Sequence, residues 1–532
     1  MRRLIPLTAA LLTLFATASA SANTRLESTF QDDPRIVYGS DAVRQKTLDE
    51  AKALGVQRVR VTAFWYLIAP ARDQTTRPAN FDPTDPNAYA ASDWERYDRI
   101  VSEIRQRGMQ VNLNPSAPGP LWAMSGAFDE RLADRTNPNP AEFGAFIGAL
   151  GRRYSGSFVP AGQTAPLPRI DYWSIWNEPN QGAWLSPQWS STQKTAVEQS
   201  PPLYRKLVDA SWIALHATGH GDDTILIGET APKGQHSLSN LKSRGTPMDA
   251  MRFLRRVYCL NDRLGFLTGG DAAKVECPET PNPAEFTAAH PGLFQMTGYA
   301  HHPYELVRSP TSRPDYPDDW VTTANLGSLT DQLERIMARY KVKRSTVPLY
   351  LTEYGYQSNP PDTGISAVSL NKQAAWINEA EYIAWRNRYV RTLAQFLLYD
   401  DAPVPGETDP DQKWSTFQTG LRFGPGSGRD GKAKPAYDAY RLPFFLPKRT
   451  AARNGNLKVW GRVRPGGGSG PRDVELQLRD AKGRYKRFKQ FKTSKYGFVN
   501  KTVRVRRASA LRLAWKSGSK TYYSRGVSFR VR

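Results

Sequence analysis

The sequence predicts a (β/α)8 barrel followed by a small antiparallel β-sandwich. Eight short apolar or β-branched runs alternate with longer helix-like segments over about 410 residues, which is typical of a parallel barrel. From residue 457 onward, short alternating runs are separated by glycine-containing turns, which indicates an antiparallel sandwich. The early part of the sequence has no glycine-rich strand-to-helix turn, and this favours the barrel over an open, nucleotide-binding sheet.

The expected barrel strands are short and spread over the first 400 residues. They are Ile36–Tyr38, Arg58–Ala63, Gln110–Leu113, Asp171–Trp176, Thr224–Gly228, Met296–Ala300, Leu349–Thr352 and Leu393–Tyr399. Helix starts are predicted between them. Asn139 precedes a proline at the first helical position, and the stretches 47–50 and 92–95 have the pattern of capping boxes.

Both ends of the chain carry further signals. Met1-Arg2-Arg3, an apolar run and small residues before position 23 predict a secretory signal peptide over residues 1–22. The apolar run is shorter than the roughly 20 residues that span a bilayer, and no later stretch comes close. We therefore expect a secreted protein, extracellular or associated with the cell wall, without a membrane span. The expected domains are the barrel (23–446), a linker (447–456) and a basic Ig-like β-sandwich (457–532).

The sequence contains two cysteines, Cys259 and Cys277. In an oxidising compartment they would close one loop on the large domain, and the disulfide is favoured because secreted chains seldom keep isolated thiols. The alternative is two independent buried thiols.

The positive charge is concentrated at the C-terminal end. The chain carries a net charge of +23, and residues 447–532 hold 25 Lys and Arg against three acidic residues. This module could hold the protein on an anionic cell-wall polymer, an acidic polysaccharide or nucleic acid, or it could only solubilise or stabilise the barrel. Its basic residues alternate along strands and form no recognition motif, so no specific nucleic-acid binding is expected.

Carboxylates follow two of the predicted strands. The fourth strand leads into Asn177-Glu178-Pro179, and the seventh carries Glu353 followed by Gly355. Pro179 keeps Glu178 out of the α conformation and cannot donate to the strand ladder. In a barrel, strand ends meet at one rim, so the two carboxylates should lie together.

Other polar and aromatic residues are expected at the same rim. They are Arg60, Trp65, Trp184, Glu229, His301, His302, Tyr304 and Trp414. The two histidines have no third ligand at zinc spacing, so neither a metal nor another cofactor is expected.

These motifs together resemble the clan A retaining glycoside hydrolases, and most closely families 5 and 39. The resemblance rests on "WNEPN" after strand four, "LTEYG" on strand seven and His302-x-Tyr304 after strand six, and it covers about residues 36–446. It implies that Glu178 is the general acid/base and Glu353 the nucleophile.

The resemblance also implies roles for the residues around them. Asn177 corresponds to the residue that hydrogen-bonds the sugar 2-hydroxyl. Arg60 and Tyr304 correspond to groups that orient the nucleophile and keep it ionised, and His302 and Trp414 correspond to subsite residues. The substrate implied is an oligo- or polysaccharide cleaved at a β-glycosidic bond with retention.

Several residues keep a second interpretation. Both glutamates could be structural carboxylates paired with arginines, and Arg60 an ordinary buried ion-pair partner. Glu229 could bind sugar hydroxyls, or orient Glu178 or a loop. Trp65, Trp184 and Trp414 could stack on sugars or fill the core. For the whole protein, the alternatives are a transglycosylase using the same site and a non-catalytic protein that binds carbohydrate or cell wall.

Overall fold

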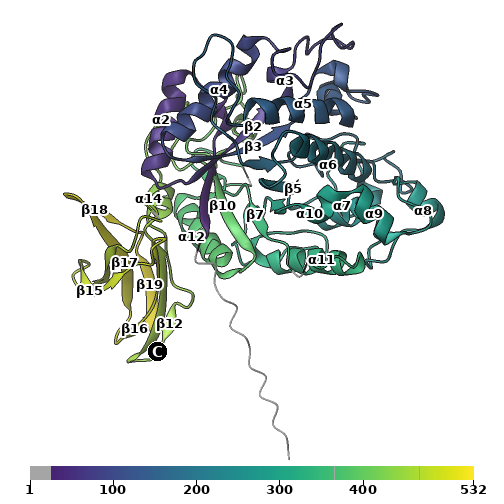
Figure 1. Cartoon of the computed structure of the whole chain (residues 1–532). Coiled ribbons are helices and arrows are strands. Elements are labelled where there is room, and N and C mark those ends of the chain that lie inside the picture. Colours follow the sequence, from purple (N-terminus) through teal and green to yellow (C-terminus); the bar gives the residue numbers. More distant parts are fainter. Residues whose placement is uncertain (1–24, 345, 365, 467) are drawn as a thin grey trace, which may run out of the picture.

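The computed structural model describes residues 25–344, 346–364, 366–466 and 468–532. A large α/β domain contacts a smaller β domain at the C-terminal end of the chain (Figure 1). The expected signal peptide lies outside the described residues.

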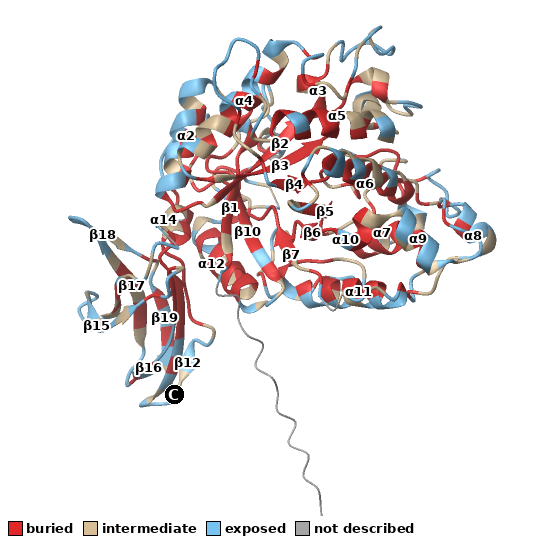
Figure 2. Ribbon diagram, in the orientation of Figure 1, coloured by how far each residue is buried: buried red, intermediate tan, exposed pale blue. Residues whose placement is uncertain are grey.

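The larger domain is a closed barrel of eight parallel strands, in the order β1-β10-β7-β6-β5-β4-β3-β2. This confirms the predicted (β/α)8 fold. The strands are β1 (Glu27–Gln31), β2 (Arg58–Phe64), β3 (Gln110–Ser116), β4 (Tyr172–Ser174), β5 (Thr224–Thr230), β6 (Gly298–His301), β7 (Leu349–Leu351) and β10 (Val390–Phe396). They are mostly buried, whereas the surrounding helices expose their outer faces (Figure 2).

The first strand differs from the prediction. β1 pairs in parallel with both β10 and β2, which closes the barrel. Residues 36–38, expected as this strand, instead contain the end of helix α1 (Asp33–Ile36) and the residues after it. The Asp32 side chain accepts a hydrogen bond from the Arg35 N–H, and a proline lies in the first helical turn. These local start signals favour a helix despite the β-branched residues that follow.

Helices cover the outside of the barrel. The longer ones are α2 (Asp41–Ala53), α4 (Ala91–Gln106), α5 (Pro140–Arg153), α6 (Ser200–Ala217), α7 (Ala250–Val257), α11 (Leu326–Arg339) and α12 (Leu370–Arg386). The shorter ones are α3 (Trp65–Ile68), α8 (Gly269–Ala273), α9 (Pro283–Ala289), α10 (Pro291–Gln295), α13 (Pro410–Lys413) and α14 (Pro435–Arg441). Asn139 caps α5 as predicted, whereas α2 and α4 begin before the two expected capping boxes.

The C-terminal domain contains a sheet in the order β11-β13-β16 and a second sheet in the order β12-β19-β17-β14-β15, with β18 paired to β17. Their strands are β11 (Phe444–Phe445), β12 (Thr450–Ala451), β13 (Gly455–Arg462), β14 (Asp473–Arg479), β15 (Tyr485–Lys492), β16 (Phe498–Val505), β17 (Ser509–Ser517), β18 (Lys520–Tyr523) and β19 (Val527–Val531). Pairing is antiparallel except between β12 and β19.

The segment 447–456, expected as a linker, contains β12 and the start of β13, and both pair within the sandwich. A two-residue pair, β8 (Ser358–Asn359) and β9 (Val368–Ser369), lies in the loop after β7.

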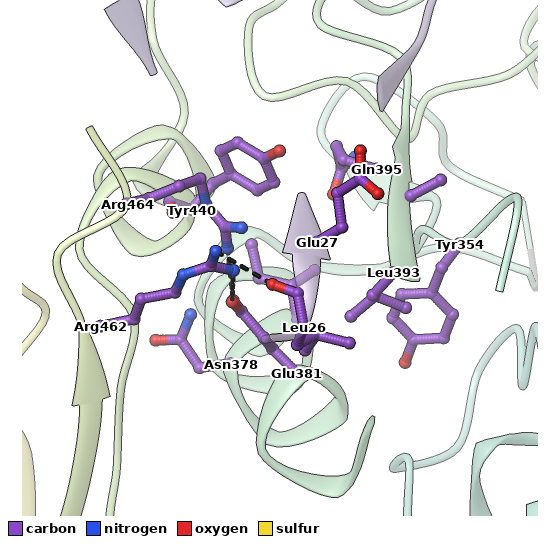
Figure 3. A pocket seen from close by; sticks show the side chains of 12 residues that line it. Leu26, Glu27, Tyr354, Asn378, Glu381, Leu393, Gln395, Tyr440, Arg462 and Arg464 are labelled. Atoms are coloured by element: carbon purple, nitrogen blue, oxygen red, sulfur yellow. Dashed lines mark hydrogen bonds and ion pairs between the residues drawn. The ribbon is translucent and has the colours of Figure 1, made fainter. Parts of the chain in front are cut away.

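Two arginines of the sandwich are inserted into the barrel wall. Arg462 and Arg464 both pair with Glu381 of α12, and all three side chains are at most 4% exposed. Figure 3 shows these residues beside the start of β1, where Arg462 also donates to the Leu26 carbonyl. The cavity at this junction has a volume of about 20 Å³, so the two domains are closely packed here.

Cys259 and Cys277 form a disulfide, with a Cα–Cα distance of 5.7 Å, as predicted. Arg205 of α6 lies against it and donates to the Cys259 sulfur at 3.1 Å. In the described part of the chain, no helix combines the length and apolar character needed to cross a membrane.

Candidate active site

The residues after β4 place Glu178 at the carboxyl end of the barrel. The Glu178 N–H donates to the Glu229 carbonyl at 3.0 Å, which fixes the chain across the end of β5. Three residues here have positive φ values: 63° for Trp176, 38° for Glu178 and 47° for Glu229. Left-handed backbone is costly for such side chains and is often found at functional sites. Pro179 follows Glu178 directly, and the backbone there is indeed outside the right-handed α region.

Glu353 reaches the same rim from β7. Its Oε1 accepts a hydrogen bond from Arg60 at 2.9 Å, and its Oε2 accepts one from the Tyr304 hydroxyl at 3.1 Å. The backbone just before it is held by a bond from the Thr352 N–H to the His301 carbonyl at 3.2 Å. The two carboxylate oxygens are therefore held by side chains from β2, across the barrel, and from the segment after β6, the strand beside β7.

The two carboxylates lie close together. One oxygen from each of Glu178 and Glu353 and a ring nitrogen of His302 all lie within 4.8 Å of one another. The side chains of Glu178 and Glu353 are 19% and 10% exposed, whereas His302 is completely covered. These two carboxylates are thus the acidic groups of this cluster that a ligand entering the barrel mouth can reach.

Arg60 lies beneath the carboxylates and is fully buried. Besides Glu353, its guanidinium donates to Asn177 Oδ1 at 2.6 Å and to Glu229 Oε2 at 3.0 Å. It also donates to two residues that sequence reasoning missed, Gln31 on β1 and Asn114 on β3. This side chain of β2 therefore contacts residues on, or directly after, five of the other seven strands. Arg60 has no exposed surface, and its contacts are with these groups, among them Glu353, the residue that it is expected to orient.

His302 bridges the carboxylates. Its Nδ1 lies 2.9 Å from Glu178 Oε1 and 3.6 Å from Glu353 Oε2, and its Nε2 lies 2.7 Å from Glu229 Oε2. Burial lowers the pKa of His302, but Glu353, Glu178 and Glu229 outweigh it and raise this pKa to about 10. The ring is therefore an imidazolium at neutral pH and donates from both nitrogens.

The preceding histidine behaves in the opposite way. His301 is buried, its Nδ1 lies 2.9 Å from the Thr230 hydroxyl, and its Nε2 lies 3.0 Å from the Val321 carbonyl. Burial lowers its pKa to about 3, so it is neutral. It joins β5, β6 and the following loop and takes no part in the carboxylate cluster.

Glu229 does not bind substrate, because its side chain is fully buried. Its Oε2 accepts hydrogen bonds from Arg60, His302 and the Thr352 hydroxyl, the last at 2.7 Å. Burial raises the pKa of Glu229, but Arg60 and His302 outweigh it and lower this pKa to about 2. Of the two roles considered from the sequence, contact with sugar hydroxyls is therefore excluded by burial.

The titration of Glu353 is set by opposing effects. Burial raises its pKa, the cations His302 and Arg60 lower it, and the carboxylates Glu178 and Glu229 raise it further. The net direction is upward from the ordinary value. Glu353 is thus harder to ionise than an exposed glutamate, even though two cations face it.

Asn177 is held by both its backbone and its side chain. Its backbone N–H donates to the Ser116 hydroxyl at 2.9 Å, and its side-chain carboxamide oxygen accepts from Arg60. Since the oxygen faces Arg60, the NH₂ end is directed away from the guanidinium. This residue is 3% exposed and lies directly before Glu178.

The aromatic residues divide into core and rim. Trp65 is 1% exposed and stacks on Phe146 with ring centroids 5.5 Å apart, so the expectation that it binds substrate is corrected: it is a core residue. Trp414 is 8% exposed, and its recorded ring contact is with the Lys413 ammonium. Trp184 is partly exposed and stacks on Phe64 at 6.4 Å, at the end of β2.

A second aromatic group on the rim was missed in the sequence. Phe417 is 55% exposed and packs edge-on against Phe396 at 5.2 Å. Phe396 in turn lies 6.5 Å from the ring of Tyr304, the residue that donates to Glu353. Three residues beyond Trp414, Phe417 is therefore the exposed ring after the eighth barrel strand.

Two groups of side chains among the described residues have metal-ligand spacing. The first is Glu178, His302 and Glu353, in which His302 lies within hydrogen-bond distance of Glu178 and also contacts Glu229. The second is His236, Asp249 and Asp319 in the loops after β5 and β6. There, His236 lies 3.3 and 3.2 Å from the two carboxylates, which are also held by Trp320 and Arg255.

The missed polar residues did leave a signal in the sequence. On β3, Asn112, Asn114 and Ser116 alternate with apolar residues, and all three are buried. Polar residues that recur at every second position of a buried strand must find partners inside the barrel. Asn114 does so by donating to the carbonyls of Ser174 and Trp176 and accepting from Arg60.

No protein-family model matches this sequence, and no curated protein matches it. Among solved structures, a family 39 glycoside hydrolase from Bacteroides cellulosilyticus WH2 is similar at 14% identity and a TM-score of 0.44, over 90% of this chain and 79% of that chain. A β-glucosidase from Trichoderma harzianum is similar at 15% identity and 0.43, over 80% and 97% of the two chains. A β-glucuronidase from Bacteroides uniformis is similar at 12% identity and 0.40, and this chain spans 46% of its length. At these identities they assign no activity, and the function below is inferred from the geometry of the site.

Proposed function

We propose that the protein is a secreted glycoside hydrolase that cleaves β-glycosidic bonds with retention of the anomeric configuration. The observation that supports this is the approach of Glu178 and Glu353 within 4.8 Å, from the ends of β4 and β7. Retaining enzymes hold their two carboxyls about 5–5.5 Å apart, whereas inverting enzymes leave roughly 6.5–9.5 Å for a water molecule. The close pair favours direct attack.

In the first step, Glu178 donates its proton to the glycosidic oxygen while Glu353 attacks the anomeric carbon. The bond between this carbon and the leaving oxygen breaks, and an ester between Glu353 and the sugar forms. Arg60 and Tyr304 hold the attacking carboxylate in place, so little reorganisation is needed as its charge is consumed.

In the second step, Glu178 removes a proton from water, and the water oxygen attacks the anomeric carbon. The ester bond breaks, Glu353 returns to its carboxylate form and Glu178 is again protonated. Glu178 can change from acid to base because Glu353 loses its charge when the ester forms. A neutral ester beside Glu178 no longer opposes the ionisation of Glu178.

Three rim residues are suited to hold the sugar. The NH₂ of Asn177 is the free end of an amide whose oxygen Arg60 holds, and it can donate to a sugar hydroxyl. Trp184 follows β4 in the same segment as Glu178, and Phe417 follows β10, the neighbour of β7 that leads to Glu353. Aromatic faces of this kind stack on the apolar face of a sugar ring.

The test is a panel of aryl β-glycosides and β-linked polysaccharides, with Glu178→Gln and Glu353→Gln compared with the wild type. We expect hydrolysis of at least one substrate and a loss of at least about 10³-fold in kcat for each variant, since each removes a proton donor or the nucleophile. Following the reaction by proton NMR should show the β-anomer as the first product. An α-anomer would contradict retention, and unchanged activity in Glu353→Gln would contradict the assigned site.

The two rival functions are separated in the same assay. Transglycosylation would give longer products when an acceptor sugar is added, at the expense of free reducing sugar. A non-catalytic binding protein would retain glycans on affinity gels and cleave none of the panel. Glu198→Gln, which removes a buried carboxylate that pairs with Arg252 and Arg256, is the matched control for loss of a buried acid elsewhere in the barrel.

Secretion is part of the proposal and is supported by the N-terminal sequence pattern and by the disulfide, which is favoured in oxidising compartments. Expression of the full chain should release a protein into the medium whose N-terminal sequence begins at residue 23. Retention in the cell with an intact Met1 would contradict this.

We also propose that the sandwich binds an acidic polysaccharide. A groove of about 480 Å³ lies in this domain, and Lys489, Arg504, Arg506 and Arg507 line it with their exposed side chains. The groove has no acidic lining residue, and its aromatic lining is partly or fully covered. The negative charges of an acidic polysaccharide complement such a surface. Single-stranded nucleic acid, in contrast, usually needs exposed aromatic rings for base stacking.

Affinity electrophoresis in gels containing polygalacturonate tests this, with the Glu353→Gln variant used to prevent cleavage. Replacing the four groove cations by Gln should abolish the retardation, and replacing Lys495, Lys501, Lys516 and Lys520 by Gln is the control with the same change in charge. Equal retardation of the two variants would mean that net charge alone is responsible. Stronger binding to DNA than to polygalacturonate would overturn the assigned partner.

A further inference from the structure

Glu229 has the geometry of a second buried anion placed under the catalytic pair. It lies at the end of β5, is fully buried, and its Oε2 alone accepts from Arg60 at 3.0 Å, from His302 at 2.7 Å and from Thr352 at 2.7 Å. Two of these donors also bind the carboxylates of the proposed catalytic pair: Arg60 binds Glu353 and His302 binds Glu178. Glu229 is therefore linked to both members of the pair through one intervening side chain each.

The charges of the cluster balance only when Glu229 is counted. The charged groups that contact His302 are Glu178 after β4, Glu229 on β5 and Glu353 after β7. Arg60 on β2 pairs with Glu229 and Glu353, and the preceding His301 on β6 is neutral. With His302 and Arg60 cationic and Glu229 and Glu353 anionic, the cluster is neutral while Glu178 keeps its proton. Without the charge of Glu229, the buried site would carry one uncompensated positive charge, which costs several kcal/mol in a low-dielectric interior.

We propose that Glu229 is a positioning residue whose carboxylate keeps His302 cationic, so that the ring nitrogen facing Glu178 is always a hydrogen-bond donor. A donor at this place can support Glu178 both as a neutral acid, through its carbonyl oxygen, and as the carboxylate that forms when the leaving group departs. The consequence for catalysis rests on the proposed glycosidase function, whereas the consequence for His302 does not.

Loss of the carboxylate charge should reverse this hydrogen bond. In Glu229→Gln, the excess positive charge is relieved when His302 loses a proton. The remaining proton stays on Nε2 if the new amide oxygen accepts it, and Nδ1 then becomes an acceptor. Glu178 would have to donate its own proton to the histidine instead of to the leaving group. Glu229→Asp keeps the charge and moves it by one methylene, so His302 should remain cationic.

The decisive measurement is the titration of His302 by NMR in protein labelled with ¹⁵N-histidine, assigned with His302→Gln. In the wild type and in Glu229→Asp, both ring nitrogens of His302 should remain protonated from pH 5 to pH 9. In Glu229→Gln the ring should lose one of these protons within this range, at a lower pH than in the wild type. Glu198→Gln should leave the wild-type pattern unchanged. A wild-type His302 that titrates near 6.5, or a cationic His302 in a folded Glu229→Gln protein, would overturn the proposal.

The kinetic measurement separates positioning from a merely structural effect. We expect kcat to fall about 100-fold in Glu229→Gln with KM within about 3-fold, and Glu229→Asp to recover at least about 10-fold of the loss. An equal loss in both variants would contradict the role of the charge. If no substrate is cleaved even by the wild type while the titrations behave as described, the glycosidase function fails and the role of Glu229 in holding His302 stands.

Discussion

Arg60 Nη1 donates a hydrogen bond of 2.9 Å to Glu353 Oε1, and these two residues are 293 positions apart in the sequence. The other terminal nitrogen of the same guanidinium binds Asn177 and Glu229, the residues that surround the second carboxylate. Glu353, the proposed nucleophile, and the segment that carries Glu178, the proposed acid, are thus positioned by one planar cation. A lysine could not replace it, because an ammonium group is a compact point charge without the fixed fork of a guanidinium.

Arg60→Lys should therefore keep the charge but lose the arrangement. We expect kcat to fall at least about 100-fold, with a far-ultraviolet circular dichroism spectrum like that of the wild type. The matched control is Arg107→Lys, on the barrel surface, where the side chain pairs with the exposed Asp49. Wild-type activity in Arg60→Lys would show that only its charge matters.

The pH dependence of kcat/KM should reflect the buried nucleophile. Glu353 must be ionised to attack, and burial raises its pKa above the ordinary value despite His302 and Arg60. Activity should therefore fall as the pH drops through a value above about 4.3, the ordinary pKa of glutamate. The measurement is a profile of kcat/KM from pH 3.5 to 8 with an aryl glycoside. An acid limb below that value would show that the two cations dominate over burial.

Trp184 and Trp65 should respond differently to truncation. Trp184→Ala removes an exposed rim face, and we expect KM to rise up to about 10-fold with little change in the free energy of unfolding. Trp65→Ala leaves a cavity in the core, and we expect a loss of about 3–5 kcal/mol in that free energy. Urea denaturation and steady-state kinetics on both variants check this, and similar stability losses in the two would contradict the division into rim and core.

The disulfide should contribute to the stability of the barrel. It closes a loop with a sequence separation of 18. Removing such a crosslink by replacing Cys259 and Cys277 with serine should cost about 3 kcal/mol, since the unfolded chain regains freedom. We expect the double variant to unfold at a lower urea midpoint than the oxidised wild type. The reduced wild type should have the same lowered midpoint as the double variant. Equal midpoints for oxidised and reduced protein would refute the contribution.

The junction between the domains should depend on Glu381. Removing its charge leaves Arg462 and Arg464 buried without a carboxylate, which typically costs about 3–5 kcal/mol. In Glu381→Gln we expect the sandwich to become sensitive to limited proteolysis at a lower temperature than in the wild type. The control is Glu475→Gln on the sandwich surface, where the partner Arg487 lies 3.7 Å away and both side chains are exposed.

The barrel could be predicted from the sequence because each strand is a short apolar or β-branched run. Seven of the eight expected strands overlap a barrel strand, and the eighth was displaced to residues 36–38, where the Asp32 cap and a proline start a helix. Glu178 and Glu353 were predicted for the same reason, since strand ends meet at one rim whatever the loops do.

The sequence by itself determined the fold class, the two rim carboxylates, the disulfide and the basic C-terminal domain, because these depend on residue types at local spacing. Only the tertiary structure decided which groups are covered. Glu229, a candidate sugar contact, is fully buried, Trp65 lies in the core, and Phe417 is exposed at the rim. The tertiary structure also made one of two adjacent histidines cationic and the other neutral, because three carboxylates from different strands contact His302, whereas desolvation dominates at His301. The desolvation of a side chain and the charges around it depend on residues that are distant in the chain, so no local sequence pattern predicts them.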